Sequence, residues 1–262
     1  MKKVSNVEID EYYDGMKELP DGSFKISPSG VSNFFNRTAN WFGENLLGND
    51  GFNGNTASIL GSIVHKAAET DEIPTGDDID NYLALQTCDY DREEILRNYY
   101  DMCVAIIADN IDHTIESKEQ FKFTHIKDVI YVGGTYDAIT NNGLKTLVDY
   151  KTSGTKPSRF SKDYRMQLLV YCYILKKNNI HIDQIELRYI VRATKTLPVR
   201  VISFIEPIDN SNLEFIESVL NMMADSVIAF RDYPHLRHII SQDGRNKNSR
   251  CVINKPIEDE EI

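Results

Sequence analysis

Apolar and polar residues recur with two different periods along this chain, and the change divides it into a helical part and a mixed part. From about residue 29 to 112 the pattern predicts helices, most clearly over 91–109. The later segments predict strands 121–126, 131–139 and 144–152, a helix 163–177, strands 184–192 and 198–204, and a helix 210–231. We therefore expect an α/β fold, with a mixed β-sheet flanked by helices after an N-terminal helical region.

A hairpin is the sharpest local prediction. The runs 131–139 and 144–152 are rich in β-branched and aromatic residues, and Asn142-Gly143 lies between them. Asn-Gly favours a tight hairpin turn because both residues tolerate positive φ. The pairing of the two arms should make Asp137 and Asp149 neighbours.

Two carboxylates and a lysine should therefore share one surface of this hairpin. Side chains alternate across a strand, so Asp149 and Lys151 point to one face and Tyr150 to the other. Metal-assisted phosphodiester hydrolysis needs such a set, because carboxylates hold a hard divalent cation while an ammonium group orients or activates water. Oxygen ligands favour magnesium or manganese over zinc. The alternative is that these are ordinary solvent-facing residues of an antiparallel strand.

Three further segments accompany the hairpin: a serine-capped apolar helix, a Gly-x3-His helix and a Gln-x3-Tyr helix. They are residues 26–35 with Trp41 beyond, residues 61–69, and residues 164–175. In this order the series resembles the PD-(D/E)XK nuclease superfamily, in its RecB-like and lambda-exonuclease-like branch, over roughly residues 26 to 204. Tyr136 stands where many relatives carry Pro, and Asp149 where Glu is commoner; neither change removes a group that the chemistry needs.

The resemblance implies a restriction-endonuclease-like core and a role for each motif residue. Lys151 acts on the attacking water or the developing charge, and the Gln-x3-Tyr pair hydrogen-bonds the scissile phosphate or the lysine. The implied metal ligands are His65, Asp137, Asp149 and the Tyr150 carbonyl. The implied catalytic residues are Asp137, Asp149, Lys151, Gln167 and Tyr171.

Two of these assignments keep a structural alternative when the residues are considered alone. His65 lies beside an alanine-rich helical stripe, where a histidine is more often a hydrogen-bonded packing residue. Glu69 shares its helix face and could orient it or face the site as well. Tyr171 lies in a helix that is largely apolar, so it could be a buried packing residue.

Charge is unevenly distributed along this chain of net charge −11. Residues 145–255 hold 18 Lys and Arg against 11 Asp and Glu, a balance of +7, so the remainder carries −18. The acidic residues concentrate in 8–21, 71–94 and 258–261. Such acidic surfaces either repel nucleic acid toward one face or dock a partner protein.

The basic residues nearest the expected site connect the second hairpin strand to the Gln-x3-Tyr helix. They are Lys156, Arg159, Lys162 and Arg165. This segment could hold the DNA backbone beside the metal, because phosphate contacts by Lys and Arg position a duplex. The equally weighted alternative is a solvated loop.

The cysteines argue against an iron–sulfur cluster. Some RecB-like nucleases hold one through a cysteine near the opening helix and three near the C-terminus. This chain has Asn36 near the first position and Cys251 alone in the C-terminal region, so that four-cysteine ligation is not available. We expect Mg²⁺ or Mn²⁺ as cofactor and no cluster.

Length and composition fit one nuclease domain over 1–262. We divide it into an acidic N-terminal segment, a mainly helical part, an α/β catalytic core and a C-terminal tail: residues 1–25, 26–115, 116–240 and 241–262. No run approaches the ~18 apolar residues of a membrane span, and the N-terminus lacks a signal-peptide core. We expect a cytoplasmic protein without membrane contact, and the sequence predicts no particular oligomeric state.

The leading hypothesis is a metal-dependent DNA nuclease that hydrolyses phosphodiester bonds. The branch resemblance implies an exonuclease of DNA recombination, repair or replication, of the kind common in bacteria and their phages. The alternative is a non-catalytic nucleic-acid-binding or partner-docking protein that keeps the fold. Such a protein would be expected to have lost an acid or the lysine, and here Asp137, Asp149 and Lys151 are all present.

Overall fold

The computed structural model describes residues 23–46 and 54–233, and every structural statement below refers to that part of the chain. Six strands and seven helices follow one another in the order β1 (Phe24–Ile26), α2 (Pro28–Asn36), α3 (Thr38–Leu46), α4 (Thr56–Thr70), α5 (Gly76–Ala84), α6 (Arg92–Ile111), β2 (Ile115–Ile126), β3 (Ile130–Asn141), β4 (Lys145–Ser153), α7 (Lys162–Lys177), β5 (Gln184–Val191), β6 (Arg200–Pro207) and α8 (Asn210–Asp232).

The expected α/β class and element order are confirmed, with two corrections. Strand β1 precedes the opening helix and was not predicted, since a run of three residues carries too little pattern. Strand β2 begins at Ile115, where the prediction began at 121, because its polar first half shows no apolar alternation. Several features named above lie outside the described residues: 1–22 with the acidic stretch 8–21, the last residues 234–240 of the expected core, and the whole tail 241–262 with Cys251 and the acidic stretch 258–261.

The sheet is mixed, and strand β3 is its organising element. Antiparallel β2 pairs along one edge of β3, while β1 and β4 pair with the other edge. Parallel β1 reaches only residues 130–132 of β3, and antiparallel β4 only residues 138–141. Residues 133–137 of β3 therefore have no strand partner on that edge. Beyond β4 the sheet continues with parallel β5 and antiparallel β6.

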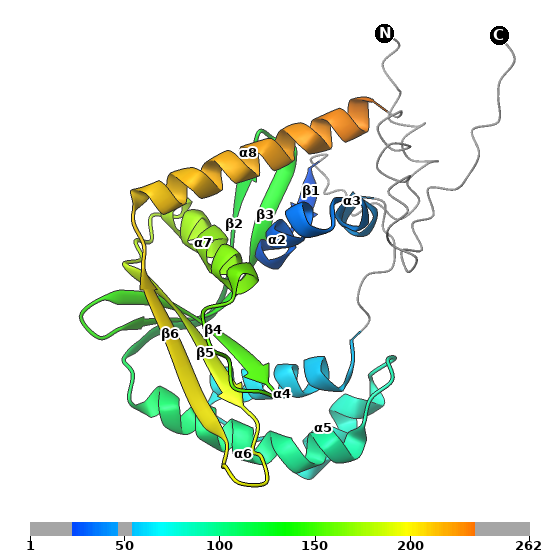
Figure 1. The fold of residues 1–262 in the computed structure, drawn as a ribbon, viewed down its shortest axis with the longest axis vertical. Helices are drawn as coiled ribbons and strands as arrows, with labels where there is room; N and C mark the ends of the chain where they lie inside the picture. Colours follow the sequence, from blue (N-terminus) through cyan, green and yellow to red (C-terminus); the bar gives the residue numbers. More distant parts are fainter. Residues whose placement is uncertain (1–22, 47–53, 234–262) are drawn as a thin grey trace, which may run out of the picture.

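Helices cover both faces of the sheet, as Figure 1 shows. Neighbouring residues of β4 separate the two layers: Leu147 packs in the cluster that includes α2, α3, α7 and α8, whereas Val148 packs in the cluster that includes α4, α5 and α6. Because both faces are covered, residues 146–150 of β4 and 185–191 of β5 are buried without interruption. In β5 this burial includes Glu186 and Arg188, which alternate with apolar residues and bind each other.

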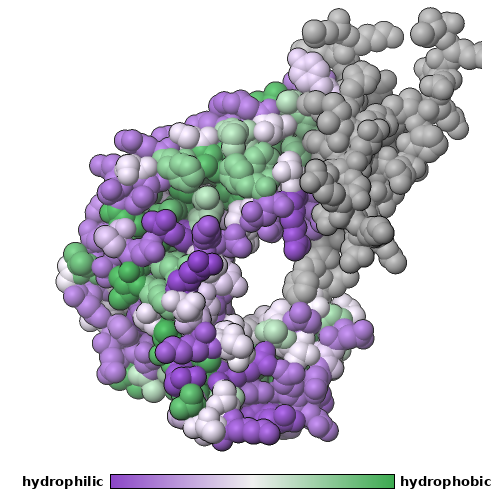
Figure 2. All heavy atoms as spheres, in the orientation of Figure 1, coloured by the Kyte–Doolittle hydropathy of each residue, from purple (hydrophilic) through white to green (hydrophobic). Residues whose placement is uncertain are grey.

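The molecule is hollowed between these two helical layers. Figure 2 shows this hollow between the layer that contains α7 and α8 and the layer that contains α4 to α6, beside the sheet. None of the helices in residues 23–46 and 54–233 combines the length and the apolar character needed to cross a membrane.

Candidate active site

The predicted hairpin of β3 and β4 forms, and its strands are joined by the three residues 142–144, between the pair Asn141 and Lys145. Gly143 takes a positive φ of 99°, but Asn142 does not take one, in contrast to the predicted Asn-Gly turn.

Away from the turn, the pairing of β3 with β4 ends at Ala138, which lies opposite Val148. The two strands separate at the next residues, Asp137 of β3 and Asp149 of β4. The Tyr150 amide donates to Asp137 Oδ2 at 2.7 Å, so a carboxylate replaces the main-chain partner at this point.

Asp149 is held in a buried position by two side chains. It is 4% exposed, and Gln167 Nε2 from α7 donates to its Oδ1 at 2.9 Å. Lys151 Nζ lies 2.7 Å from the other oxygen, Oδ2. Burial raises the pKa of Asp149 to about 6; Lys151 counteracts this rise, and the Asp137 carboxylate adds to it.

Lys151 shares a face with Asp149, as the strand alternation predicts. Its ammonium group also lies 5.0 Å from the centre of the Tyr164 ring. Burial by itself would lower the pKa of Lys151, but Asp149 and Asp137 outweigh that effect, and the pKa is raised. Lys151 is therefore a protonated cation between two carboxylates.

Helix α4 brings His65 to the hairpin. Its Nδ1 lies 3.6 Å from Asp137 Oδ1, which is too long for a good hydrogen bond. Burial opposes protonation, yet the pKa of His65 is raised because the Asp137 carboxylate favours the charged ring. The helix passes close to β4 at Gly61, where an added Cβ would lie 3.4 Å from Thr152 Oγ1. The Glu69 carboxylate forms an ion pair with Lys66. The carboxylate that lies beside the His65 ring is therefore that of Asp137.

Tyr171 uses its hydroxyl on the main chain. It donates to the Thr135 carbonyl at 2.7 Å, within the stretch of β3 that lacks a strand partner. Gly134 lies against this hydroxyl, because a Cβ added at Gly134 would be 2.7 Å from the Tyr171 hydroxyl oxygen. Burial raises the pKa of Tyr171, and the nearby carboxylates of the site act in the same direction. The resemblance implied a contact of this residue with the scissile phosphate or the lysine; in the structure its hydroxyl donates to a main-chain carbonyl.

A cleft of about 700 Å³ lies beside these groups, along α4 and next to β4 and the first turn of α7. We call it the α4 cleft. Its lining residues are Asn55, Ala57, Ser58, Gly61, Ser62, His65, Lys66, Glu69, Glu119, Lys151, Thr152 and Tyr164. Both His65 and Lys151 are therefore reached from this cleft.

Glu119 is a cleft residue that sequence reasoning missed. It lies in β2 at a φ of 35°, a left-handed conformation that is uncommon for residues other than glycine. Burial raises its pKa, and the neighbouring Glu69 carboxylate raises it further. No motif marked this residue, because its place in the cleft depends on a local distortion of β2.

The four basic residues of the β4–α7 segment do not line the α4 cleft. Lys156 and Arg159 are exposed in the loop, and Lys162 is exposed at the first position of α7. Arg165 forms an ion pair with Glu206 of β6, at 2.6 Å. All four basic residues are thus exposed, and Arg165 is in addition already paired.

The donor atoms of the site fit a hard divalent cation, although the set is incomplete. Within residues 23–46 and 54–233, no three His, Cys, Asp or Glu side chains are grouped closely enough to hold a metal. However, Asp149 Oδ2 is buried and accepts no hydrogen bond of good geometry, even with Lys151 nearby. It retains the lone pairs that a cation takes, and main-chain carbonyls and water commonly complete such a shell.

Comparison with known proteins gives one family match and several similar solved structures. A family model described as the PD-(D/E)XK nuclease superfamily matches residues 25–237. A candidate exonuclease from Eubacterium rectale has a similar solved structure, with a TM-score of 0.52 and 15% identity over 88% of this chain and 87% of that one. An alkaline exonuclease from Laribacter hongkongensis gives a TM-score of 0.39 and 13% identity, over 67% and 92% of the two chains.

At these identities the likeness to solved structures concerns the fold alone, and a search of curated sequences found no match. The family match is of another kind, because it spans α2 to α8 and includes every motif residue of the candidate site. The chain belongs to the PD-(D/E)XK nuclease superfamily.

Proposed function

We propose that this chain is a Mg²⁺- or Mn²⁺-dependent deoxyribonuclease that hydrolyses phosphodiester bonds from DNA ends. The observation that carries the proposal is the grouping of Asp137, Asp149, Lys151 and His65 from three segments beside one cleft, which His65 and Lys151 line. Hairpin strands supply the first three, and α4 supplies the histidine. Burying two acids beside a lysine and a histidine is costly, and such groups with perturbed pKa values concentrate at functional sites.

The residues that would hold the cation are Asp137, Asp149, His65 and the Tyr150 carbonyl. When bound, a divalent ion lowers the pKa of a coordinated water and neutralises charge on the phosphate. The Tyr150 amide keeps Asp137 in place, and Gln167 does the same for Asp149. Both acids are thus held by hydrogen bonds that leave other oxygen lone pairs free.

Lys151 acts in this proposal on the developing negative charge. Its raised pKa keeps it protonated at neutral pH, which suits a donor to the phosphate oxygens better than a base. Lysine in this state also offsets the repulsion between the two carboxylates before a cation binds.

DNA would be held by the exposed basic residues of the β4–α7 segment: Lys156, Arg159 and Lys162. Arg165 would have to leave Glu206 in order to join them. The acidic residues around α5 and the start of α6 would repel DNA from that side of the molecule or dock a protein partner. The exonuclease mode, the role in recombination, repair or replication, a phage or bacterial setting and the cytoplasmic location belong to the same proposal and rest on the branch resemblance.

The test uses end-labelled linear DNA and covalently closed DNA, each with Mg²⁺ or Mn²⁺. We expect loss of linear DNA alone, abolished by Asp149→Asn or Lys151→Met and by a chelator. Asp225→Asn is the matched control, because it changes an exposed aspartate of α8 that pairs with Lys127. Cutting of the closed form would make the protein an endonuclease.

A different result would favour the non-catalytic alternative. The native chain would then leave both DNA forms intact with either metal and still retard DNA in a gel. Under that outcome Asp149→Asn would not change DNA binding more than Asp225→Asn does.

A further inference from the structure

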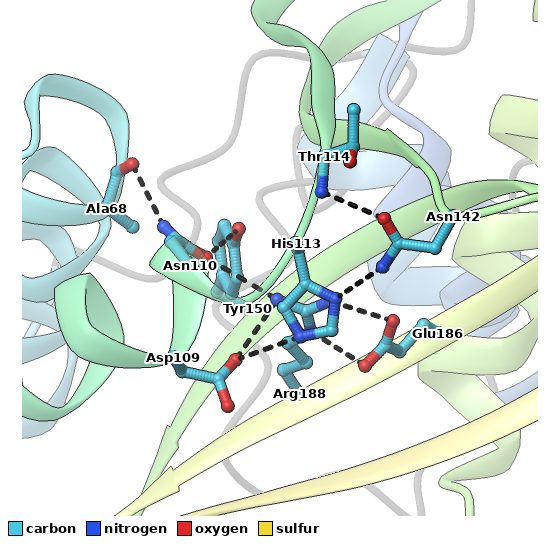
Figure 3. A network of polar contacts seen from close by, with 9 residues as sticks. All are labelled: Ala68, Asp109, Asn110, His113, Thr114, Asn142, Tyr150, Glu186 and Arg188. Atoms are coloured by element: carbon cyan, nitrogen blue, oxygen red, sulfur yellow. Dashed lines mark hydrogen bonds and ion pairs between the residues drawn. The ribbon is translucent and has the colours of Figure 1, made fainter.

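Asn110, at the end of α6, joins the elements that carry the candidate site. Its side chain is buried, with 4% of the residue exposed. Nδ2 donates to the Ala68 carbonyl of α4 at 3.4 Å, and Oδ1 accepts from the Tyr150 hydroxyl of β4 at 2.9 Å. Arg188 of β5 donates to the same oxygen at 3.4 Å. Figure 3 shows these contacts converging on one amide.

The Ala68 carbonyl is one of the last four in α4, which ends at Thr70. Such carbonyls have no partner within their own helix and need one from elsewhere. Asn110 supplies it from a buried position, so the amide fixes where the end of α4 lies relative to α6. His65 precedes Ala68 by one turn of the same helix, and its position follows from that of the helix end.

Hydrogen bonds hold both the side chain and the main chain of Tyr150. Its hydroxyl is bound to Asn110 on the side of the sheet that α4 and α6 cover. Its amide donates to Asp137 Oδ2, and its carbonyl is a proposed metal ligand. Fixing the phenol therefore restrains the main chain from which the cation site is built.

The support for Asn110 is itself rigid. Arg188 has no exposed surface and binds Glu186 through two hydrogen bonds of 2.6 and 3.0 Å. It also donates to Asp109, the neighbour of Asn110 on α6, at 3.1 Å. Burial raises the pKa of Glu186, but the bonds from Arg188 outweigh this and the pKa is lowered. A buried charge network with its hydrogen bonds satisfied holds one arrangement.

We propose that Asn110 and the Tyr150 hydroxyl are positioning residues that set how closely His65 approaches Asp137, and thereby how tightly the site binds a divalent cation. The inference rests on the proposed function. The two ligands are 3.6 Å apart and share no good hydrogen bond, so their contact does not hold them. Their spacing depends on the position of α4, which carries His65, and on the Tyr150 amide of β4, which holds the Asp137 carboxylate. Asn110 is bound to both α4 and β4.

The first test measures Mn²⁺ binding to the whole chain by electron paramagnetic resonance, without DNA. Tyr150→Phe keeps the ring and loses the bond to Asn110, and we expect Mn²⁺ affinity to fall about tenfold, as for other groups that orient metal ligands. Tyr173→Phe is the matched control. This variant also removes the hydroxyl of a buried tyrosine, but that hydroxyl donates to Glu217 of α8, on the other side of the sheet from α4 and α6. Its Mn²⁺ affinity should equal that of the native chain.

A second variant isolates the α4 contact. Asn110→Asp keeps an oxygen for Tyr150 and Arg188 and loses the donor to Ala68, so we expect weaker Mn²⁺ binding here too. Raising the Mn²⁺ concentration should restore DNA cleavage by both variants, which a general loss of structure would not allow.

Three results separate the possibilities. Weaker Mn²⁺ binding by Tyr150→Phe, with Tyr173→Phe unchanged, supports the positioning role. Native affinity in folded Tyr150→Phe and Asn110→Asp overturns that role and leaves the proposed nuclease intact. Absence of Mn²⁺ binding by the native chain overturns the metal-dependent function, and the positioning role with it.

Discussion

The Tyr150 amide donates a hydrogen bond of 2.7 Å to the Asp137 carboxylate, at the point where main-chain pairing between β3 and β4 stops. An amide that would otherwise bind a carbonyl of the neighbouring strand binds a side chain instead. The strands can therefore separate without leaving a buried amide unpaired, which would cost about 1–3 kcal/mol. This contact places Asp137 and Asp149 at the gap between β1 and β4, where β3 has no strand partner on that edge.

Replacing Asp149 with Asn should change the pH dependence of stability in metal-free protein. Burial raises the pKa of Asp149 to about 6 in the folded state, against about 3.9 in the unfolded chain. The folded state thus binds the proton more tightly, so this group lowers stability as pH rises through that interval. Asn does not ionise and keeps an oxygen for Gln167.

We therefore expect the stability of Asp149→Asn relative to the native chain to increase between about pH 4 and pH 7, by about 1–3 kcal/mol. Urea unfolding of both proteins in a chelator at the two ends of this range measures the difference. A stability difference that does not change with pH would mean that Asp149 titrates as it does in the unfolded chain.

Lys151→Met should abolish cleavage while keeping DNA binding. The variant retains the aliphatic stem beside Tyr164 and removes the cation that would meet the charge on the phosphate. We expect a rate loss on the order of 100-fold or more, as for other deleted charge-stabilising donors. Single-turnover cleavage and gel retardation measure the two properties. Lys177→Met, which removes an exposed lysine paired with Glu217, should keep the native rate.

Tyr171→Phe should lower stability more than activity. The hydroxyl donates to the Thr135 carbonyl in the unpaired stretch of β3, and its loss leaves that acceptor without its partner. We expect a loss of about 1–3 kcal/mol in unfolding free energy. A rate within a few-fold of native at low temperature would agree with this structural role. Loss of cleavage in a variant with native stability would instead support the contact with the phosphate or the lysine that the resemblance implied.

Gly134→Ala should destabilise the fold through two close contacts. The added methyl group would lie 2.7 Å from the Tyr171 hydroxyl oxygen and 3.0 Å from Pro28 Cδ, so α2 and α7 would have to move away from β3. Overpacking of this kind costs about 1–3 kcal/mol. Gly76→Ala is the control, since nothing lies within 4 Å of an added Cβ there. Thermal melts of the two variants should differ accordingly, and equal melts would contradict the close packing.

Neutralising Lys156 and Lys162 together should weaken DNA binding and reduce its salt dependence. Each lost phosphate contact lowers the slope of log affinity against log salt by about 0.9 for duplex DNA. Titrations at several salt concentrations measure the slope. The control is the pair Lys127→Gln and Lys177→Gln, which removes the same charge from residues paired with Asp225 and Glu217. If the slope of log DNA affinity against log salt is the same for both double variants, the β4–α7 segment does not contact the DNA phosphates.

The sequence by itself determined the local features of the site. Gly143 favours the hairpin because it tolerates the positive φ that it takes in the turn, and strand alternation places Asp149 and Lys151 together with Tyr150 opposite. Ser27 caps α2 as the opening serine motif predicts. These features depend on residues close together in the chain, where turn chemistry and periodicity act directly.

Only the tertiary structure decided which distant groups meet. His65 reaches Asp137 because α4 packs against β4, and Arg165 turns to Glu206 because β6 lies beside α7. Asn110 was in no motif, yet it binds both α4 and β4. Contacts of this kind follow from how buried surfaces pack and from which carbonyls and amides lack local partners. Spacing along the chain does not encode them, because each partner is chosen by the folded arrangement of elements far apart in sequence.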